Sequence, residues 1–460
     1  MKATPMFRKH FVVVFTQLLL VATFAVAQEP KESYPPNQQL VDAVEPFVKR
    51  NELAGAVMLV ADKDKVLACD TVGFADIAEK REMTSDALFW IASQSKTLTA
   101  AAFMTLVDEG KVKLDDPVDK YLPEFTNIWA AVERDSKHML LERPKRKITV
   151  RHILSHSSGL PFKSTLETPT LDGVTLTVGS RSYAMMPLEY QPGEGYQYSN
   201  AGINAAGRII EVVSGMPYEK FMSERLFEPL GMNDTVIRPS KEQLRRLAKS
   251  YKPNAAKDGL EETTIGQLTY PLDLASRQPM PAGGYFSTAD DIGRFCRMLL
   301  NEGTWEGKSI LSKEAVGEIS KRQTPADSQR SYGLGASVGP EGFGHGGAYA
   351  TNMNIDTKLG LVTVWLVQHA GFPGEGKHAQ GTSVRRRKLS LSRSHTLSFP
   401  GGAWERETGL PLQPELRTAA FLADASLELL RLLRQRGRRG FRFGDLVRFR
   451  VFLHRFRAGH

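Results

Sequence analysis

The chain has 460 residues, 41% of them hydrophobic, which suffices for one large or two ordinary globular domains. It contains only two cysteines, Cys69 and Cys296, and this excludes a disulfide-stapled scaffold. Neither cysteine has a histidine or another cysteine at metal-ligand spacing, so we expect no zinc site.

The formal net charge of +9 is unevenly distributed. Residues 381–460 hold 17 basic and 6 acidic residues, and residues 1–27 add three basic residues and no acidic one. Residues 28–380 are therefore mildly acidic. We expect no nucleic-acid partner for this part of the chain, because nucleic-acid binding requires a basic surface.

The first 27 residues have the pattern of a secretory signal peptide. A basic start precedes the apolar run 11–27, which ends in Ala-Val-Ala at Ala27. Because this run is short and is interrupted by Gln17, it makes a poor membrane span. We expect cleavage after Ala27 and export to the bacterial periplasm or medium, with no membrane span left in the mature protein. An uncleaved anchor is the alternative.

The hydrophobic pattern predicts an α+β fold. Helical spacing covers 39–48, and residues 111–330 have mostly helix and loop patterns. Strands are expected at 54–61, 66–72, 332–338, 351–356 and 361–367. We predict an antiparallel sheet with flanking terminal helices, built from about 39–85 and 330–370, and an inserted, mainly helical lobe at about 90–330.

The composition changes after Gly381. Up to residue 380 the basic residues are 25 lysines and 18 arginines, whereas residues 381–460 contain one lysine and 16 arginines. One helix is predicted in this tail, at 414–434. We interpret the tail as sequence of separate origin that follows a domain at 28–380. A basic tail that binds an acidic surface is the alternative.

Ser93-Gln94-Ser95-Lys96 is the first candidate for catalytic chemistry. Positions i and i+3 are neighbours on a helix, so Lys96 can reach the Ser93 hydroxyl and activate it as a nucleophile. The run 97–107 is apolar on nearly every side and closes at Gly110, which predicts a buried helix. Burial should lower the pKa of Lys96 and make it a proton acceptor.

Tyr198-Ser199-Asn200 is the second candidate, on a loop before a predicted helix at 201–213. From there Tyr198 can exchange a proton with Ser93. Asn200 can orient either Lys96 or an amide of the substrate.

The third candidate is the glycine-rich segment 344–348, which contains His345. Glycines let a backbone approach a ligand closely, and the N–H groups of such a strand can bind a developing oxyanion. His345 adds a hydrogen-bond donor and a titratable group.

In this order, Ser93-x-x-Lys96, Tyr198-x-Asn200 and His345-Gly346-Gly347 resemble the motifs of class C β-lactamase-like serine hydrolases and penicillin-recognising enzymes. The resemblance runs from about residue 39 to 380. Flanking segments are similar as well, at 89–92, 114–118, 121–123, 154–160 and 282–287.

The resemblance implies a two-step acyl transfer at a cleft between sheet and lobe. Ser93 attacks a carbonyl to form an acyl-enzyme, Lys96 and Tyr198 share the proton transfers, and water releases the acyl group. The backbone N–H groups of Ser93 and of Ala348, next to Gly347, would hold the oxyanion. No metal or organic cofactor is expected.

Two departures from the family pattern bear on substrate and stability. Dedicated β-lactamases usually carry Lys-Thr-Gly where this chain has His345-Gly346-Gly347, and a histidine is only partly charged at neutral pH. Efficient β-lactam turnover is therefore not expected. The family also has a helix after the last strand; here the arginine-rich tail begins instead, and its helix at 414–434 is the candidate substitute.

We expect a serine hydrolase that acts on an ester, a β-lactam or a peptide-like amide, with a small molecule or a peptidoglycan-like substrate. The alternatives are a cell-wall D,D-peptidase and a penicillin-binding or peptidoglycan-sensing protein that does not turn over. Gly335-Ala336-Ser337-Val338-Gly339 also fits the G-x-S-x-G pattern of α/β-hydrolases. We reject it, because Pro340 follows where that motif requires a helix.

Overall fold

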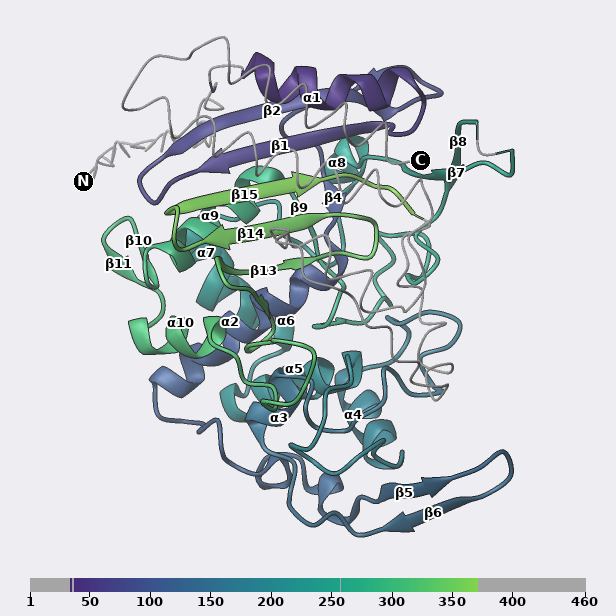
Figure 1. Ribbon diagram of the computed structural model, residues 1–460, viewed down its shortest axis with the longest axis vertical. Coiled ribbons are helices and arrows are strands. Elements are labelled where there is room, and N and C mark those ends of the chain that lie inside the picture. The colour runs from purple at the N-terminus through teal and green to yellow at the C-terminus, as the bar shows by residue number, and fades with distance from the viewer. Residues whose placement is uncertain (1–33, 35–36, 257, 371–460) are drawn as a thin grey trace, which may run out of the picture. The chain divides into compact units, whose positions relative to one another are not determined.

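The computed structural model describes residue 34, residues 37–256 and residues 258–370. These residues form an α+β fold around one seven-stranded antiparallel sheet (Figure 1), as the sequence predicted. From edge to edge its strands are β12 (Ser337–Val338), β13 (Gly342–Gly346), β14 (Asn352–Asp356), β15 (Leu361–Leu366), β1 (Gly55–Ala61), β2 (Val66–Asp76) and β3 (Arg81–Glu82).

The sheet joins two segments that lie far apart in the chain. Strand β1 pairs with β2 through a hairpin on one side. On its other side it pairs with β15, where Val57 lies opposite Leu366. The predicted assembly of the sheet from an early and a late segment is therefore confirmed.

Each face of β1 packs against a helix, and all seven of its residues are buried. On one face, Leu40 of α1 (Gln38–Lys49) lies in an apolar cluster with Met58. On the opposite face, α9 (Ala289–Leu300) packs against β1, β14 and β15 (Figure 1). The sequence placed α9 within the lobe at 90–330, but this helix belongs to the core of the sheet.

Helix α2 (Ser95–Asp108) is buried, as its apolar composition predicted. Every residue from Ser95 to Leu106 is buried. Gly110 follows with a φ of +68°, and the N–H groups of Gly110 and Lys111 donate to the carbonyls of Val107 and Leu106. This is a Schellman motif, in which glycine supplies the left-handed residue that ends the helix.

The sequence misplaced the strands before the last hairpin. The predicted strand 332–338 shrinks to β12, because Gly335 adopts a φ of +66° and its N–H donates to the carbonyl of Leu154 instead of a neighbouring strand. The glycine-rich segment, which was not among the strands expected from the hydrophobic pattern, is part of strand β13 and the residues that follow it. A Cβ on Gly344 would lie only 2.1 Å from the carbonyl oxygen of Met353 on β14, so glycine allows this pairing.

Short elements make up the rest of the lobe. Its other helices are α3 (Val150–Leu154), α4 (Leu176–Ala184), α5 (Asn200–Ser214), α6 (Tyr218–Met222), α7 (Glu228–Leu230), α8 (Lys241–Arg246) and α10 (Lys313–Ser320). Its two-stranded pairings are β4 (Phe89–Trp90) with β9 (Phe286–Ser287), β5 (Ala130–Arg134) with β6 (Met139–Glu142), β7 (Ser250–Pro253) with β8 (Leu260–Thr263), and β10 (Thr304–Trp305) with β11 (Lys308–Ser309).

The expected signal peptide at 1–27, the tail at 381–460 and its helix at 414–434 lie outside the described residues. Within the described ranges, no helix combines the length and the apolar character needed to cross a membrane. Both cysteines are free thiols, on β2 and on α9.

Candidate active site

Ser93 lies in a short 3-10 helix (Ala92–Gln94) immediately before α2. It is partly accessible, whereas Ala92 and Gln94 beside it are buried. Ala92 adopts a φ of +46°, an unusual backbone conformation for a residue with a side chain, and the N–H of Ile91 donates to the carbonyl of Tyr285. The turn that presents the nucleophile is thereby held by the β4–β9 pairing.

Lys96 donates hydrogen bonds to three neutral oxygens. Its Nζ lies 3.2 Å from Oγ of Ser93, 2.8 Å from Oδ1 of Asn200 and 2.7 Å from the carbonyl oxygen of Ala282. The side chain is completely buried. Burial without a charged partner lowers the pKa of Lys96 well below its usual value, so the neutral amine is accessible near neutral pH.

Tyr198 lies beside both of these groups. Its hydroxyl is hydrogen-bonded to Ser93, and Nζ of Lys96 lies 4.6 Å from the centre of its ring. Burial raises the pKa of the Tyr198 hydroxyl above its usual value. The phenol therefore stays protonated at neutral pH, which leaves Lys96 as the group able to accept the Ser93 proton.

Asn200 is the first residue of α5, and its side chain contacts Lys96. The sequence left two roles open for it, and the side-chain oxygen of Asn200 is used by Lys96. The carbonyl of Ala282 was not predicted as part of the site. It belongs to the segment 282–287, and the N–H of Ala282 in turn is held by Oδ1 of Asn204.

His345 lies on β13 and is buried rather than directed at solvent. Its Nδ1 lies 2.6 Å from the carbonyl oxygen of Gly346, which can only accept, so Nδ1 carries the proton. Nε2 then accepts from the hydroxyl of Tyr332 at 2.9 Å. Burial lowers the pKa of His345 to about 3.

This environment corrects the expectation of a partly charged histidine. The imidazole is neutral at physiological pH, and both of its nitrogens are engaged within the protein. His345 therefore offers no positive charge to a substrate carboxylate.

Gly347 brings the end of β13 against the segment that carries Ser93. A Cβ at this position would lie 2.6 Å from the carbonyl oxygen of Ile91 and 2.0 Å from Oγ1 of Thr351. Only glycine permits this approach. The next residue, Ala348, is partly accessible; the sequence predicts it as the second oxyanion donor.

Aromatic rings surround the catalytic groups, and sequence reasoning missed two of the residues that contribute them. His156 lies with its ring centre 4.5 Å from that of Tyr198 and 4.6 Å from that of Tyr332. Both His156 and Tyr332 are buried. No residue pattern indicated these contacts, because they join three separate stretches of chain. His156 was noted only as part of the flanking segment 154–160.

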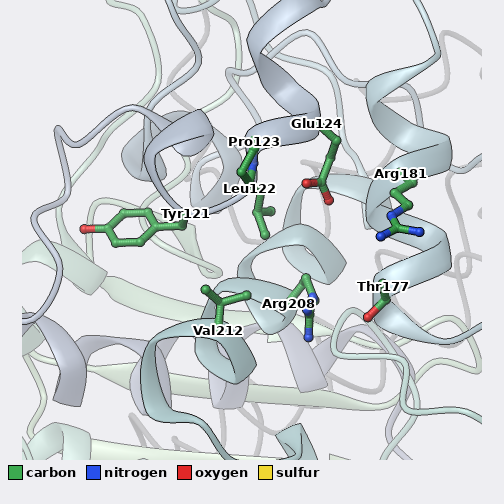
Figure 2. Close-up of a pocket in the computed structure, with 8 residues that line it drawn as sticks. All are labelled: Tyr121, Leu122, Pro123, Glu124, Thr177, Arg181, Arg208 and Val212. Atoms are coloured by element: carbon green, nitrogen blue, oxygen red, sulfur yellow. The ribbon is translucent and has the colours of Figure 1, made fainter.

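Other features of the described residues do not compete with this site. Within these ranges, no group of three or more histidine, cysteine, aspartate or glutamate side chains is placed to bind a metal. A cavity of about 400 Å³ lies elsewhere in the lobe, and it contains none of the predicted site residues (Figure 2). Its walls are Tyr121, Leu122, Pro123, Glu124, Thr177, Arg181, Arg208 and Val212.

Ser337 lies in strand β12, so it does not occupy the strand-to-helix turn that a G-x-S-x-G nucleophile needs.

Comparisons with known proteins show the family to which the chain belongs. The Beta-lactamase family model matches residues 40–382. Protein Rv1367c of Mycobacterium tuberculosis is 33% identical over 355 residues, covering 69% of this chain and 86% of that protein. Esterase EstB of Burkholderia gladioli is 26% identical, with 73% and 91% covered.

Among solved structures, EstCE1, described as a hydrolase with promiscuous acyltransferase activity, superposes with a TM-score of 0.62 at 24% identity. The alignment covers 73% of this chain and 93% of EstCE1, and it supports the same fold. The family match, together with the Ser93, Lys96 and Tyr198 geometry, identifies the chain as a member of the β-lactamase family of serine hydrolases.

Proposed function

We propose that the protein is an exported esterase that forms an acyl-enzyme on Ser93. The observation that carries this proposal is the buried Lys96, which contacts the Ser93 hydroxyl and has only neutral hydrogen-bond partners among the described residues. A lysine in this setting is a base near neutral pH, and a serine needs such a base to become a nucleophile.

Acylation follows from these contacts. The Ser93 proton passes to Nζ of Lys96 as Oγ attacks the ester carbonyl, and the oxyanion is held by the N–H groups of Ser93 and Ala348. Tyr198 contacts Ser93 and lies against Lys96, so it relays the proton to the departing alkoxide. Water then attacks the acyl-enzyme with the same groups acting in reverse, which returns Ser93 to its starting state.

The surroundings of His345 favour esters over β-lactams. A β-lactam antibiotic carries a carboxylate, and its recognition benefits from a fixed positive charge beside the nucleophile. His345 is neutral and hydrogen-bonded to Tyr332. Binding of an uncharged ester does not depend on a positive charge at this position. The similarity to esterase EstB points in the same direction.

Export is proposed from residues 1–27 alone, whose basic start, apolar run and Ala-Val-Ala ending fit a cleaved signal peptide. Expression in a bacterial host, fractionation and intact-mass analysis test it. Export predicts a periplasmic protein that starts at Gln28. A full-length protein in the membrane fraction would instead support the uncleaved anchor.

The substrate class is tested by incubating the purified protein with a short-chain nitrophenyl ester, nitrocefin, fluorescent penicillin and a peptide that ends in D-alanyl-D-alanine. We expect ester turnover, with nitrocefin turnover at least 100-fold lower in kcat/KM. Ser93→Ala should abolish turnover and covalent labelling, whereas Ser337→Ala should keep both.

Each other outcome contradicts the esterase proposal in a distinct way. Persistent penicillin label without turnover would indicate a penicillin-binding or sensing protein. Release of D-alanine as the fastest reaction would indicate a D,D-peptidase. Ester turnover that survives Ser93→Ala would show that Ser93 is not the nucleophile.

A further inference from the structure

The loop that carries Tyr198 is tied to the segment 155–162 by a series of hydrogen bonds. The N–H groups of Asn200 and Ala201 both donate to the carbonyl of Phe162, and Oγ of Ser199 donates to the carbonyl of Pro161. This segment therefore provides the support against which Tyr198 is placed.

His156 makes the two contacts that lie closest to Tyr198. The N–H of Gln197, the residue before the tyrosine, donates to the backbone carbonyl of His156 at 2.9 Å. The N–H of Ser199, the residue after it, donates to Nδ1 of the His156 ring at 3.2 Å. The N–H groups of both residues that flank Tyr198 are thus held by one residue.

The backbone of His156 adopts a rare conformation that makes this double contact possible. Its φ is +60°, in the left-handed region that residues with side chains seldom occupy, and the residue is completely buried. Such conformations persist only where surrounding structure enforces them, and they concentrate at functional sites. Here the turn directs the carbonyl and the ring of His156 toward the same loop.

The tautomer of His156 follows from its contacts. Because Nδ1 accepts from a backbone N–H, the neutral ring carries its proton on Nε2. Within the described part of the chain Nε2 has no hydrogen-bond partner, and the ring instead lies against Tyr198 and Tyr332. The imidazole therefore contacts the ring of Tyr198. Among the described residues it makes no hydrogen bond to Ser93.

We propose that His156 is a positioning residue that fixes the Tyr198 hydroxyl at Ser93 through the Nδ1 contact to the Ser199 N–H. The inference rests on the proposed function, because it concerns the proton transfers of that reaction. A reacting group misplaced by about 1 Å can lose on the order of 100-fold in rate, so a small shift of the loop is sufficient to matter.

A pair of variants isolates the Nδ1 contact. Asparagine tolerates the left-handed conformation, and its side-chain oxygen can accept the Ser199 N–H as Nδ1 does. Glycine also tolerates this conformation but offers no acceptor. We expect His156→Gly to lower kcat for the nitrophenyl ester on the order of 10- to 100-fold with KM changed less than about twofold. His156→Asn should recover most of kcat.

A double-mutant cycle separates positioning from general destabilisation. Once Tyr198→Phe has removed the hydroxyl, a residue that acts through this hydroxyl has nothing left to position. His156→Gly should therefore lower kcat little further in the Tyr198→Phe background. An equal loss of kcat from His156→Gly in both backgrounds would contradict the positioning role. So would a His156→Asn variant whose kcat is no higher than that of His156→Gly at equal Tm.

Amide hydrogen exchange tests the same contact without relying on turnover. The peptide that contains Ser199 should exchange faster in His156→Gly than in the wild type, and His156→Asn should restore protection. Unchanged exchange in His156→Gly would overturn the inference even if the protein hydrolyses esters. Faster exchange in a protein that turns over no substrate would retain the contact but overturn the esterase proposal.

Discussion

Nζ of Lys96 donates to Oδ1 of Asn200 across 2.8 Å, although 104 positions separate the two residues in the chain. Lys96 belongs to the first turn of α2, and Asn200 is the first residue of α5, which is held at its N-terminus by the Ser199 hydroxyl. The packing of two helix starts therefore sets the position of the base. An amide oxygen supports the lysine without supplying the negative charge that would keep it protonated.

Asn200→Asp should raise the pKa of Lys96 by placing a carboxylate within hydrogen-bond distance of Nζ. Because the neutral amine is the active form, the acidic limb of the kcat/KM profile should move to higher pH, and the rate at pH 7 should fall at least tenfold. Asn200→Ala provides the control, because it removes a hydrogen-bond acceptor without adding charge. The acidic limb of its kcat/KM profile should not move to higher pH. A pH profile for the ester substrate measures both, and an unmoved limb in Asn200→Asp would show that Lys96 is not the titrating base.

His345 should weaken the fold in acid. Burial lowers its pKa to about 3, whereas an unfolded histidine titrates at about 6.5. Between these values the unfolded chain binds more protons than the folded chain, so the free energy of unfolding falls as the pH is lowered below about 6.5. One such histidine contributes roughly 1.4 kcal/mol per pH unit.

His345→Gln should reduce this slope by about that amount in urea unfolding between pH 6.5 and 4.5. His138→Gln is the matched control, because the His138 side chain is 81% exposed, and it should leave the slope unchanged. Equal slopes for His345→Gln and the wild type would mean that the buried imidazole does not titrate as its environment implies.

Gly347→Ala should impair catalysis more than stability. Its Cβ would lie 2.6 Å from the carbonyl oxygen of Ile91, a backbone atom that cannot move without displacing the turn at Ser93. We expect a loss of kcat/KM on the order of 100-fold from disturbance of the oxyanion donors. Gly317→Ala on α10 serves as the control, because its Cβ meets nothing within 4 Å and its activity should be unchanged. Normal activity in Gly347→Ala would remove Ala348 from the site.

Arg277→Met should destabilise the fold strongly. Arg277 and Asp172 are completely buried, and Nε of Arg277 lies 2.7 Å from Oδ2 of Asp172. Removing the cation leaves a buried carboxylate without its partner, which costs about 3–5 kcal/mol of unfolding free energy. Thermal and urea unfolding measure the loss. Lys49→Met breaks a solvent-exposed pair with Glu45 and should leave Tm unchanged; a comparably small effect of Arg277→Met would contradict the prediction.

The sequence predicted the site best where reactive side chains lie close together along the chain. Ser93 and Lys96 are neighbours on one helix, and this could be read directly from the chain. Tyr198 and Asn200 were found because their side chains have distinctive chemistry next to a helix start. The structure brings all four together around Nζ of Lys96.

Contacts that depend on backbone atoms or on distant packing could not be predicted in the same way. The Ala282 carbonyl that binds Lys96 belongs to a residue whose side chain carries no chemical signature. Strand β13 was missed because glycine usually disfavours strands, whereas here close approach to β14 requires it. Nε2 of His345 is hydrogen-bonded to the hydroxyl of Tyr332, a residue that the sequence placed in the wrong element.

The pairing of β1 with β15 also sets the order in which a working enzyme can arise during synthesis. Strand β1 is among the first parts of the described chain to leave the ribosome, yet its partner β15 is the last strand of that described part to be made. Until then one edge of β1 has unsatisfied backbone groups and is open to wrong pairing with other chains. Gly347 and Ala348 are made in the same late segment. A nascent chain therefore already contains Ser93, Lys96 and Tyr198 but lacks the segment that is predicted to complete the oxyanion site. We expect hydrolytic activity only once the sheet has closed.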